Sequence, residues 1–202
     1  LGITQFDVLL RPQKGDGFLV SPDGNPNTTG AKLIGLATGK LQEIASGISS
    51  GSIKGLLVLG EDATECGIPA AHLDKLQSLV VMGILPDQTT AHAQVVLPSA
   101  AWTEKRGSMI NTRGRLQRLN RAVASPGQAR DDWEILRDLI QAATGANGIY
   151  TIEDVFKLMA SEIPALTGLT LSRIGDLGID LSEKLEIPLE TSPLPAVAIS
   201  AV

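Results

Sequence analysis

The chain has 202 residues, 43% of them hydrophobic, and a formal net charge of −5 at pH 7. This length suits one domain, or one domain with an appendage, and the apolar content excludes wholesale disorder. The acidic balance excludes a general nucleic-acid binder, and the one cysteine, Cys66, excludes an internal disulfide and a metal site built from cysteines alone.

The first 40 residues carry little hydrophobic periodicity. Phe6–Leu10 and Phe18–Val20 predict two short strands, and a turn-forming run follows at residues 21–27. Asn27 predicts the N-cap of a short helix near Leu33.

Strands and helices then alternate as far as residue 97. Continuous apolar runs predict three buried strands, at 53–59, 79–82 and 95–97. The periodicity predicts three helices, one ending near Gly51, one starting at Pro69 and one at 89–93. Because the strands are continuous apolar runs and only 3% of the residues are aromatic, we predict an α/β fold with a Rossmann-like parallel sheet and helices on both faces.

The next region predicts a hairpin. Gly107–Thr112 and Arg115–Leu119 form its two strands, with the turn at Arg113 and Gly114. A helix is the alternative, because the apolar side chains that follow residue 115 also fall at helical spacing.

Two further helices are predicted from capping patterns. Asp131 with Glu134 predicts a capping box that opens a helix ending at Gly145. Its expected buried stripe consists of Trp133, Leu136, Ile140 and Ala143. Thr151 with Asp154 predicts a second capping box, and the proline-rich end of the chain is expected to be an extended tail that lies on a partner or is disordered.

These elements predict that the chain consists of two parts. Residues 1–145 form a Rossmann-like domain, expected to be truncated at its N-terminus because the chain starts at Leu1 and not at Met. Residues 146–202 form a helical appendage and the proline-rich tail. No apolar run approaches the ~20 residues of a membrane-spanning helix, and no secretory signal is visible.

The stretch from Ala93 to Leu136 carries the most specific pattern of the chain. An apolar strand ending at Pro98 is followed by Thr103-Glu-Lys, then by Asn111-Thr-x-Gly-Arg-x-Gln, then by Pro126-Gly-x-Ala-Arg-x-Asp-Trp-x-Ile. In this order and spacing the segments resemble the distal part of the molybdopterin oxidoreductase superfamily. They resemble most closely the large iron–sulfur subunit of NADH–quinone oxidoreductase (respiratory complex I).

This resemblance implies a scaffold region with no catalytic residue, metal or cofactor of its own. Iron–sulfur clusters are then expected in an N-terminal part of the protein that precedes this chain. The partners would be other subunits of the complex, which transfers electrons from NADH to quinone. The expected location is the cytoplasm, peripheral to the inner membrane.

The alternative is a cofactor-binding fragment of a molybdopterin guanine dinucleotide oxidoreductase such as a formate dehydrogenase. Its site would consist of Gly60, Glu61, Asp62, Asn111, Arg113 and Arg115. The first three follow a predicted strand, where open α/β sheets bind ligands, and such enzymes typically have Gly-Glu-Asn-Pro there. A carboxylate at position 62 disfavours an adjacent pyrophosphate, so a solvated acidic turn is the other interpretation. Arg113 stands where the large iron–sulfur subunit usually has Glu.

A run of basic side chains spans the predicted hairpin, with no acidic residue among them: Lys105, Arg106, Arg113, Arg115, Arg118 and Arg121. We call these six residues the basic ribbon. They suit a phosphate, a cofactor or an acidic partner, or they keep an exposed hairpin edge charged. A third hypothesis follows, in which the chain is a stand-alone anion or nucleotide binder.

The remaining polar candidates predict structure and not chemistry. Glu104, Asn111 and Gln117 match positions of the resembled family and are expected to fix the loop by buried hydrogen bonds. His72, His92 and Cys66 have no neighbours at metal-ligand or catalytic spacing, so we expect ordinary packing roles.

Overall fold

The computed structural model describes residues 5–17, 19–36 and 39–189. Its helices are α1 (Thr28–Leu33), α2 (Leu41–Ser50), α3 (Ala70–Leu73), α4 (Gln88–His92), α5 (Asp132–Thr144) and α6 (Ile152–Glu162). Its strands are β1 (Gly55–Leu59), β2 (Ser78–Gly83), β3 (Val95–Pro98), β4 (Gly107–Ile110), β5 (Arg115–Leu119) and β6 (Ile179–Asp180). Short 3₁₀ turns lie at Pro164–Leu166, Leu171–Arg173 and Ser182–Lys184.

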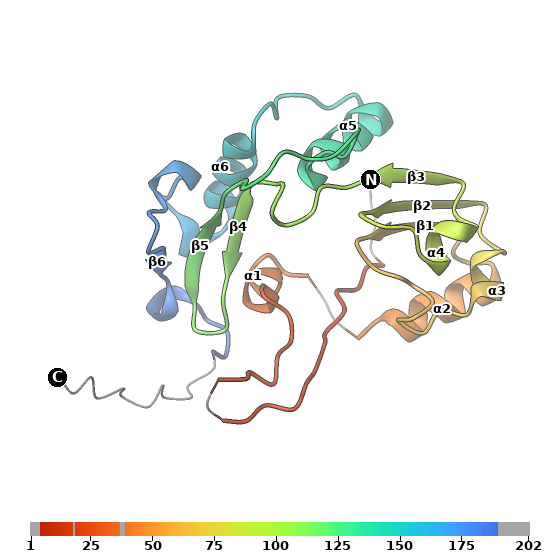
Figure 1. Ribbon diagram of the computed structural model, residues 1–202, viewed down its shortest axis with the longest axis horizontal. Helices are drawn as coiled ribbons and strands as arrows, with labels where there is room; N and C mark the ends of the chain where they lie inside the picture. The colour runs from red at the N-terminus through yellow and green to blue at the C-terminus, as the bar shows by residue number, and fades with distance from the viewer. Residues whose placement is uncertain (1–4, 18, 37–38, 190–202) are drawn as a thin grey trace.

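The elements form two lobes (Figure 1). The parallel lobe holds β1, β2 and β3 in that order with α2, α3 and α4, and the antiparallel lobe holds β4, β5 and β6 with α1 and α6. The three predicted parallel strands and the predicted hairpin are therefore confirmed. No strand forms at residues 6–10, where the sequence predicts one, and Phe18 lies outside the described residues.

The core of the parallel lobe lies on one face of its sheet. Ile44 and Ile48 of α2 pack with Leu73 of α3 against Leu79 and Val81 of β2. Right-handed crossovers place every helix on the same face when successive strands are added in one direction, as they are here. The strand order thus explains why α3 and α4, which connect the strands, lie on this side, where α2, which precedes β1, also packs.

The opposite face of the same sheet is partly open in the described part of the chain. Leu57, Leu59 and Val95 are 38%, 48% and 45% exposed. The register pairs Leu57 with Val80 and Val80 with Val95, so these side chains share one face. The predicted helices on this second face are not present among the described residues.

The antiparallel lobe contains a hydrophobic core of its own. Leu116 of the hairpin packs with Phe156 of α6 and with Leu181 near the end of the described chain. β6 pairs with β5, matching Leu116 to Ile179. A domain boundary at residue 145 remains a prediction, but these contacts join residues on both sides of it.

Helix α5 begins and ends where the sequence predicts, and Gly145 closes it with a φ of 72°. Its predicted capping box is wrong, because the carboxylate of Asp131 forms no cap hydrogen bond and binds other groups. The expected buried stripe is also incomplete: Ile140 is 43% exposed, and only Ile135 of the helix is buried. The capping box of α6, between Thr151 and Asp154, is confirmed.

Among the described residues, every helix is too short or too polar to cross a lipid bilayer.

Candidate functional site

The carboxyl end of β1 leads into an acidic corner formed by Gly60, Glu61 and Asp62. Gly60 has a φ of 68°, a conformation that favours glycine, and its N–H donates to the Met82 carbonyl at 2.8 Å. The Glu61 carboxylate forms an ion pair with Arg11, a residue of the N-terminal segment fifty positions away. This hydrogen-bonded pairing raises the pKa of the Arg11 guanidinium.

Asp62 has a structural role, because its carboxylate accepts several hydrogen bonds. Its carboxylate accepts hydrogen bonds from Thr64 N at 2.9 Å, Thr64 Oγ1 at 2.7 Å, Thr89 Oγ1 at 2.8 Å and Gln88 N at 3.2 Å. Desolvation raises its pKa, but these hydrogen bonds outweigh that effect and lower the pKa to about 2. Thr89 is fully buried and also accepts from Ala63 N at 2.7 Å. Asp62 therefore ties the corner to the first turn of α4 and does not face an open site.

A shallow, mostly apolar cavity lies between the end of β2, helix α4 and β3. Its volume is about 510 Å³, within the range of pockets that bind small molecules. It is lined by Gly83, Ile84, Leu85, Pro86, Asp87, Thr90, Ala91, Val96 and Pro98. None of these side chains is basic, so the cavity offers no cation to a phosphate.

The basic ribbon is largely paired within the chain. Lys105 binds Asp132, Arg121 binds Asp131 at 2.9 Å, Arg115 lies 3.7 Å from Asp180, and Arg118 lies 3.9 Å from Asp176. All four acidic partners lie outside the run 105–121, so these side chains are paired although the run itself contains no acidic residue. No sequence signal identifies the partners at 176 and 180, which the fold brings to the hairpin from the C-terminal segment.

The turn of the hairpin is fixed by Asn111. Its Oδ1 accepts from Arg113 N at 3.0 Å and from Arg115 N at 2.9 Å. Glu104 acts in the same way, accepting from Ala101 N at 2.9 Å. Asn111 and Glu104 thus form the expected local hydrogen bonds, but these bonds are exposed or partly buried and not buried, and Gln117 is exposed on β5.

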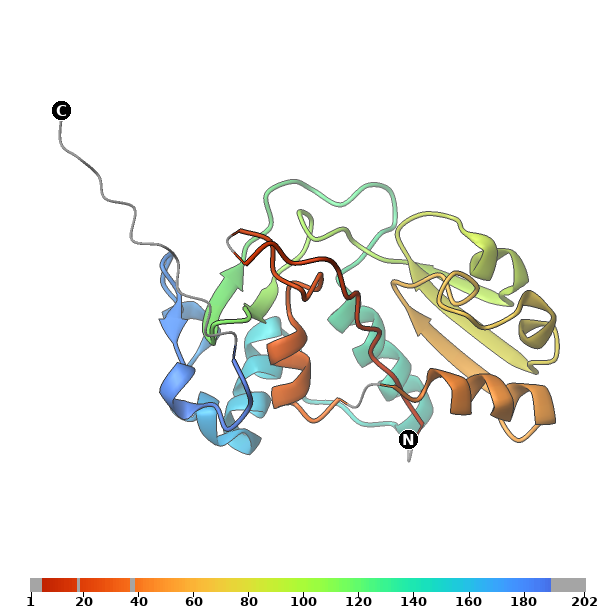
Figure 2. The same ribbon diagram turned by 90° about the horizontal axis from the view of Figure 1, so that it is seen from below.

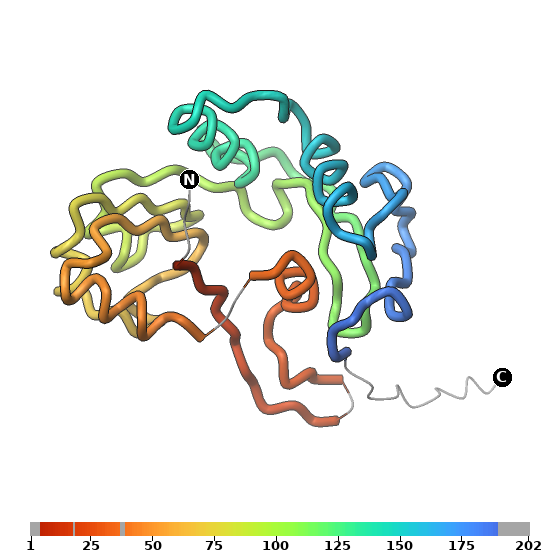
Figure 3. Tube along the Cα trace, turned by 180° about the vertical axis from the view of Figure 1, so that it is seen from behind, coloured from red at the N-terminus to blue at the C-terminus, as the bar shows by residue number. Residues whose placement is uncertain are grey.

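The six residues of the alternative cofactor site do not come together. Gly60, Glu61 and Asp62 follow β1 in the parallel lobe, and Asn111, Arg113 and Arg115 lie at the hairpin turn in the antiparallel lobe (Figures 1 and 3). Arg115 also donates to the Leu177 carbonyl at 3.0 Å, so its guanidinium is engaged within its own lobe.

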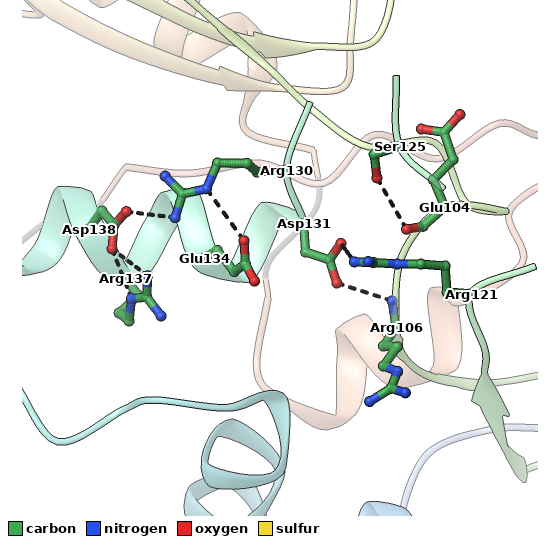
Figure 4. Close-up of polar contacts among 9 residues, drawn as sticks. All are labelled: Glu104, Arg106, Arg121, Ser125, Arg130, Asp131, Glu134, Arg137 and Asp138. Carbon is green, nitrogen blue, oxygen red and sulfur yellow. Dashed lines mark hydrogen bonds and ion pairs between the residues drawn. The ribbon is translucent and has the colours of Figure 1, made fainter. Parts of the chain in front are cut away.

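The residues between the two lobes form a polar junction. Asp131, 3% exposed, accepts from Arg121 Nη2 and from the Arg106 backbone N–H at 3.2 Å (Figure 4). On the other side, Asp132 accepts from Ser99 Oγ at the end of β3. The sequence pattern between Ala93 and Leu136 thus supplies the residues that connect the two sheets.

Cysteine and histidine do not add a reactive centre. Burial, reinforced by the charge of Glu61, raises the pKa of the Cys66 thiol. His92 Nδ1 lies 2.6 Å from Asp74 on the surface. Among the described residues, no three His, Cys, Asp or Glu side chains gather to hold a metal ion.

The fold and the junction together define an α/β domain in which a small parallel sheet is joined through α5 to an antiparallel hairpin. Residues 11–142 match the family described as Molybdopterin oxidoreductase. The chain therefore belongs to the molybdopterin oxidoreductase family.

Individual relatives agree with this membership. The NADPH-Fe(3+) oxidoreductase subunit alpha of Geobacter sulfurreducens is 37% identical over 141 residues, which cover 67% of this chain and 17% of the relative. The F420-dependent formate dehydrogenase 1 subunit alpha of Methanococcus maripaludis is 35% identical over 134 residues, covering 63% of this chain and 20% of the relative. The chain thus spans about a fifth of the length of these relatives.

The fold has a counterpart among solved structures. Acetylene hydratase from Pelobacter acetylenicus superposes with a TM-score of 0.51 and 16% identity, covering 67% of this chain and 20% of that one. At this identity the likeness concerns the fold alone.

The described residues do not by themselves fit the pyrophosphate of a pterin dinucleotide. Such a group needs free cations or N–H donors. The corner presents two carboxylates, and Arg11, the cation that contacts it, is bound to Glu61. In the other lobe, Arg115 is bound to Asp180 and to a backbone carbonyl, and Arg113 is exposed at the hairpin turn, away from the corner.

Proposed function

We propose that this chain is a supporting domain within the alpha-type subunit of a multisubunit oxidoreductase. One observation carries the proposal: four of the six basic side chains of the ribbon form ion pairs within the chain itself. Arg121 and Lys105 hold the first turn of α5, and Arg115 holds the C-terminal segment. The domain would hold its two lobes in a fixed relative position beside cofactor-bearing parts of the same subunit.

For the whole protein, a formate- or NADPH-linked oxidoreductase is the first candidate. Its support is that relatives with 35% and 37% identity are named as formate dehydrogenase and NADPH-Fe(3+) oxidoreductase alpha subunits. A molybdopterin cofactor held by other parts of that subunit would supply the redox chemistry.

The second candidate is the large iron–sulfur subunit of an NADH–quinone oxidoreductase. Its support is the pattern Thr103-Glu-Lys and Asn111-Thr-x-Gly-Arg, together with the absence of a free cation at the described corner. In this case other subunits of the complex would be the partners. We infer a cytoplasmic location, at the surface of the inner membrane.

Metal analysis of the intact protein, purified from its host, separates the two candidates. Molybdenum or tungsten near one atom per protein, with formate or NADPH oxidation, supports the first. A protein free of both metals that is purified with NADH–quinone activity supports the second.

The supporting role has its own test in the full-length subunit. Arg115→Gln should leave the molybdenum or tungsten content unchanged, because Arg115 pairs with Asp180. Arg173→Gln, at an exposed position outside the candidate cofactor residues, is the control. Loss of the metal in a folded Arg115→Gln protein, but not in the control, would show that Arg115 contacts the cofactor.

A further inference from the structure

The N-terminal segment runs past the carboxyl ends of the parallel strands (Figures 1 and 2). We call residues 5–12 of this segment the strap. Asp7 Oδ1 accepts from Gly39 N at 2.9 Å, and Arg11 forms its ion pair with Glu61 directly after β1. The strap therefore lies along the edge at which open α/β sheets bind ligands.

The loop that follows the strap orients Arg11. The Arg11 carbonyl accepts from Gly24 N at 2.8 Å, and Arg11 Nη1 donates to Asn25 Oδ1 at 3.2 Å. Asn25 in turn donates to the Leu9 carbonyl at 3.1 Å. These hydrogen bonds hold both the backbone and the guanidinium of Arg11 in the position from which it contacts Glu61.

The attachment of the strap to the parallel lobe is weak. The side chain of Arg11 is 57% exposed and that of Glu61 27% exposed, and an ion pair so placed changes an equilibrium by up to about five-fold. The apolar side chains of the strap are only partly covered, since Phe6 and Leu10 are 37% and 47% exposed and Val8 and Leu9 are half-buried. A segment held in this way opens readily and responds to salt.

We propose that Arg11 and Glu61 form a latch that keeps the strap closed over the carboxyl edge of the parallel sheet. Release of the latch frees the strap and opens this edge. The latch controls access to the sheet edge, a property separate from the supporting role of the domain.

Hydrogen exchange of the full 202-residue chain tests the latch. The reporter is the amide of Gly39, which donates to Asp7 only when the strap is closed. In the Arg11→Gln and Glu61→Gln variants, the Gly39 amide should exchange about two- to five-fold faster than in the unchanged protein at low salt. Arg113→Gln, which removes an exposed arginine elsewhere, is the control and should leave the rate unchanged.

Charge reversal and salt complete the experiment. The double variant Arg11→Glu/Glu61→Arg should restore slow exchange, and about 1 M salt should speed the unchanged protein toward the rate of the single variants. Circular dichroism verifies that each variant is folded. Equal exchange in the single variants and the unchanged protein, or a double variant as fast as the singles, would overturn the latch.

Discussion

Asp131 and Asp132 are adjacent in the sequence, and their carboxylates together bind residues on both sides of the junction. Asp131 accepts from Arg121, which follows the hairpin, whereas Asp132 accepts from Ser99, which follows β3, and from Lys105, which precedes the hairpin. The backbone strengthens the second connection, since Ala100 N donates to the Arg130 carbonyl at 2.8 Å. The first turn of α5 therefore links the two sheets.

Asp131→Ala should lower the free energy of unfolding by about 2 kcal/mol, because a buried acceptor of two hydrogen bonds is lost. Urea denaturation measures the change. Glu134→Ala, three positions on and bound only to the exposed Arg130, is the control and should change stability by less than about 0.5 kcal/mol. Equal effects in the two variants would contradict the linking role of Asp131.

Stability should depend on the ionisation of Asp62. Its pKa is lowered to about 2 in the folded chain from an ordinary value of 3.8, so its contribution is present above pH 3.8 and is lost as the pH falls toward 2. Asp62→Asn should destabilise the chain by about 1 kcal/mol at pH 6. The difference from the unchanged protein should shrink between pH 5 and pH 2 in urea titrations. A difference that stays constant with pH would show that the charge of Asp62 is not involved.

The antiparallel lobe should depend on the C-terminal segment. Leu181 is fully buried against the hairpin core, so Leu181→Ala should reduce the free energy of unfolding by about 2–4 kcal/mol. Leu177→Ala provides the comparison, because Leu177 is 85% exposed, and its effect should be close to zero. A harmless Leu181→Ala would mean that residues beyond 145 are only attached to the hairpin and do not help to fold it.

Gly178 should tolerate no side chain. Its φ is 72°, and an added Cβ would collide with the Leu116 carbonyl oxygen, where the chain enters β6. Gly178→Ala should therefore destabilise the chain by at least about 1–2 kcal/mol in thermal or urea unfolding. At Gly175 an added Cβ meets nothing within 4 Å, so Gly175→Ala should be neutral.

The sequence predicts local elements well where one short pattern determines them. Continuous apolar runs locate β1, β2 and β3, and Thr151 with Asp154 locates the start of α6. The role of Asn111 is predictable because an amide beside a glycine turn bonds to nearby backbone, which depends on neighbours in sequence alone.

Long-range partners could not be predicted in the same way. Arg11 and Glu61 are fifty residues apart, and the charge of Arg115 meets Asp180 only because β6 pairs with β5. The capping box expected at Asp131 fails for the same reason, since a tertiary partner, Arg121, competes for the carboxylate. Side chains that satisfy one another across the fold resemble free binding groups when only the sequence is read.

The aliphatic side chains left uncovered on the parallel sheet have a practical consequence for anyone who purifies this polypeptide by itself. Leu57, Leu59 and Val95 would meet water together, on a sheet whose outer strands also offer unpaired backbone groups. Light scattering should show particle size growing with concentration, and Leu57→Lys should keep the preparation monodisperse.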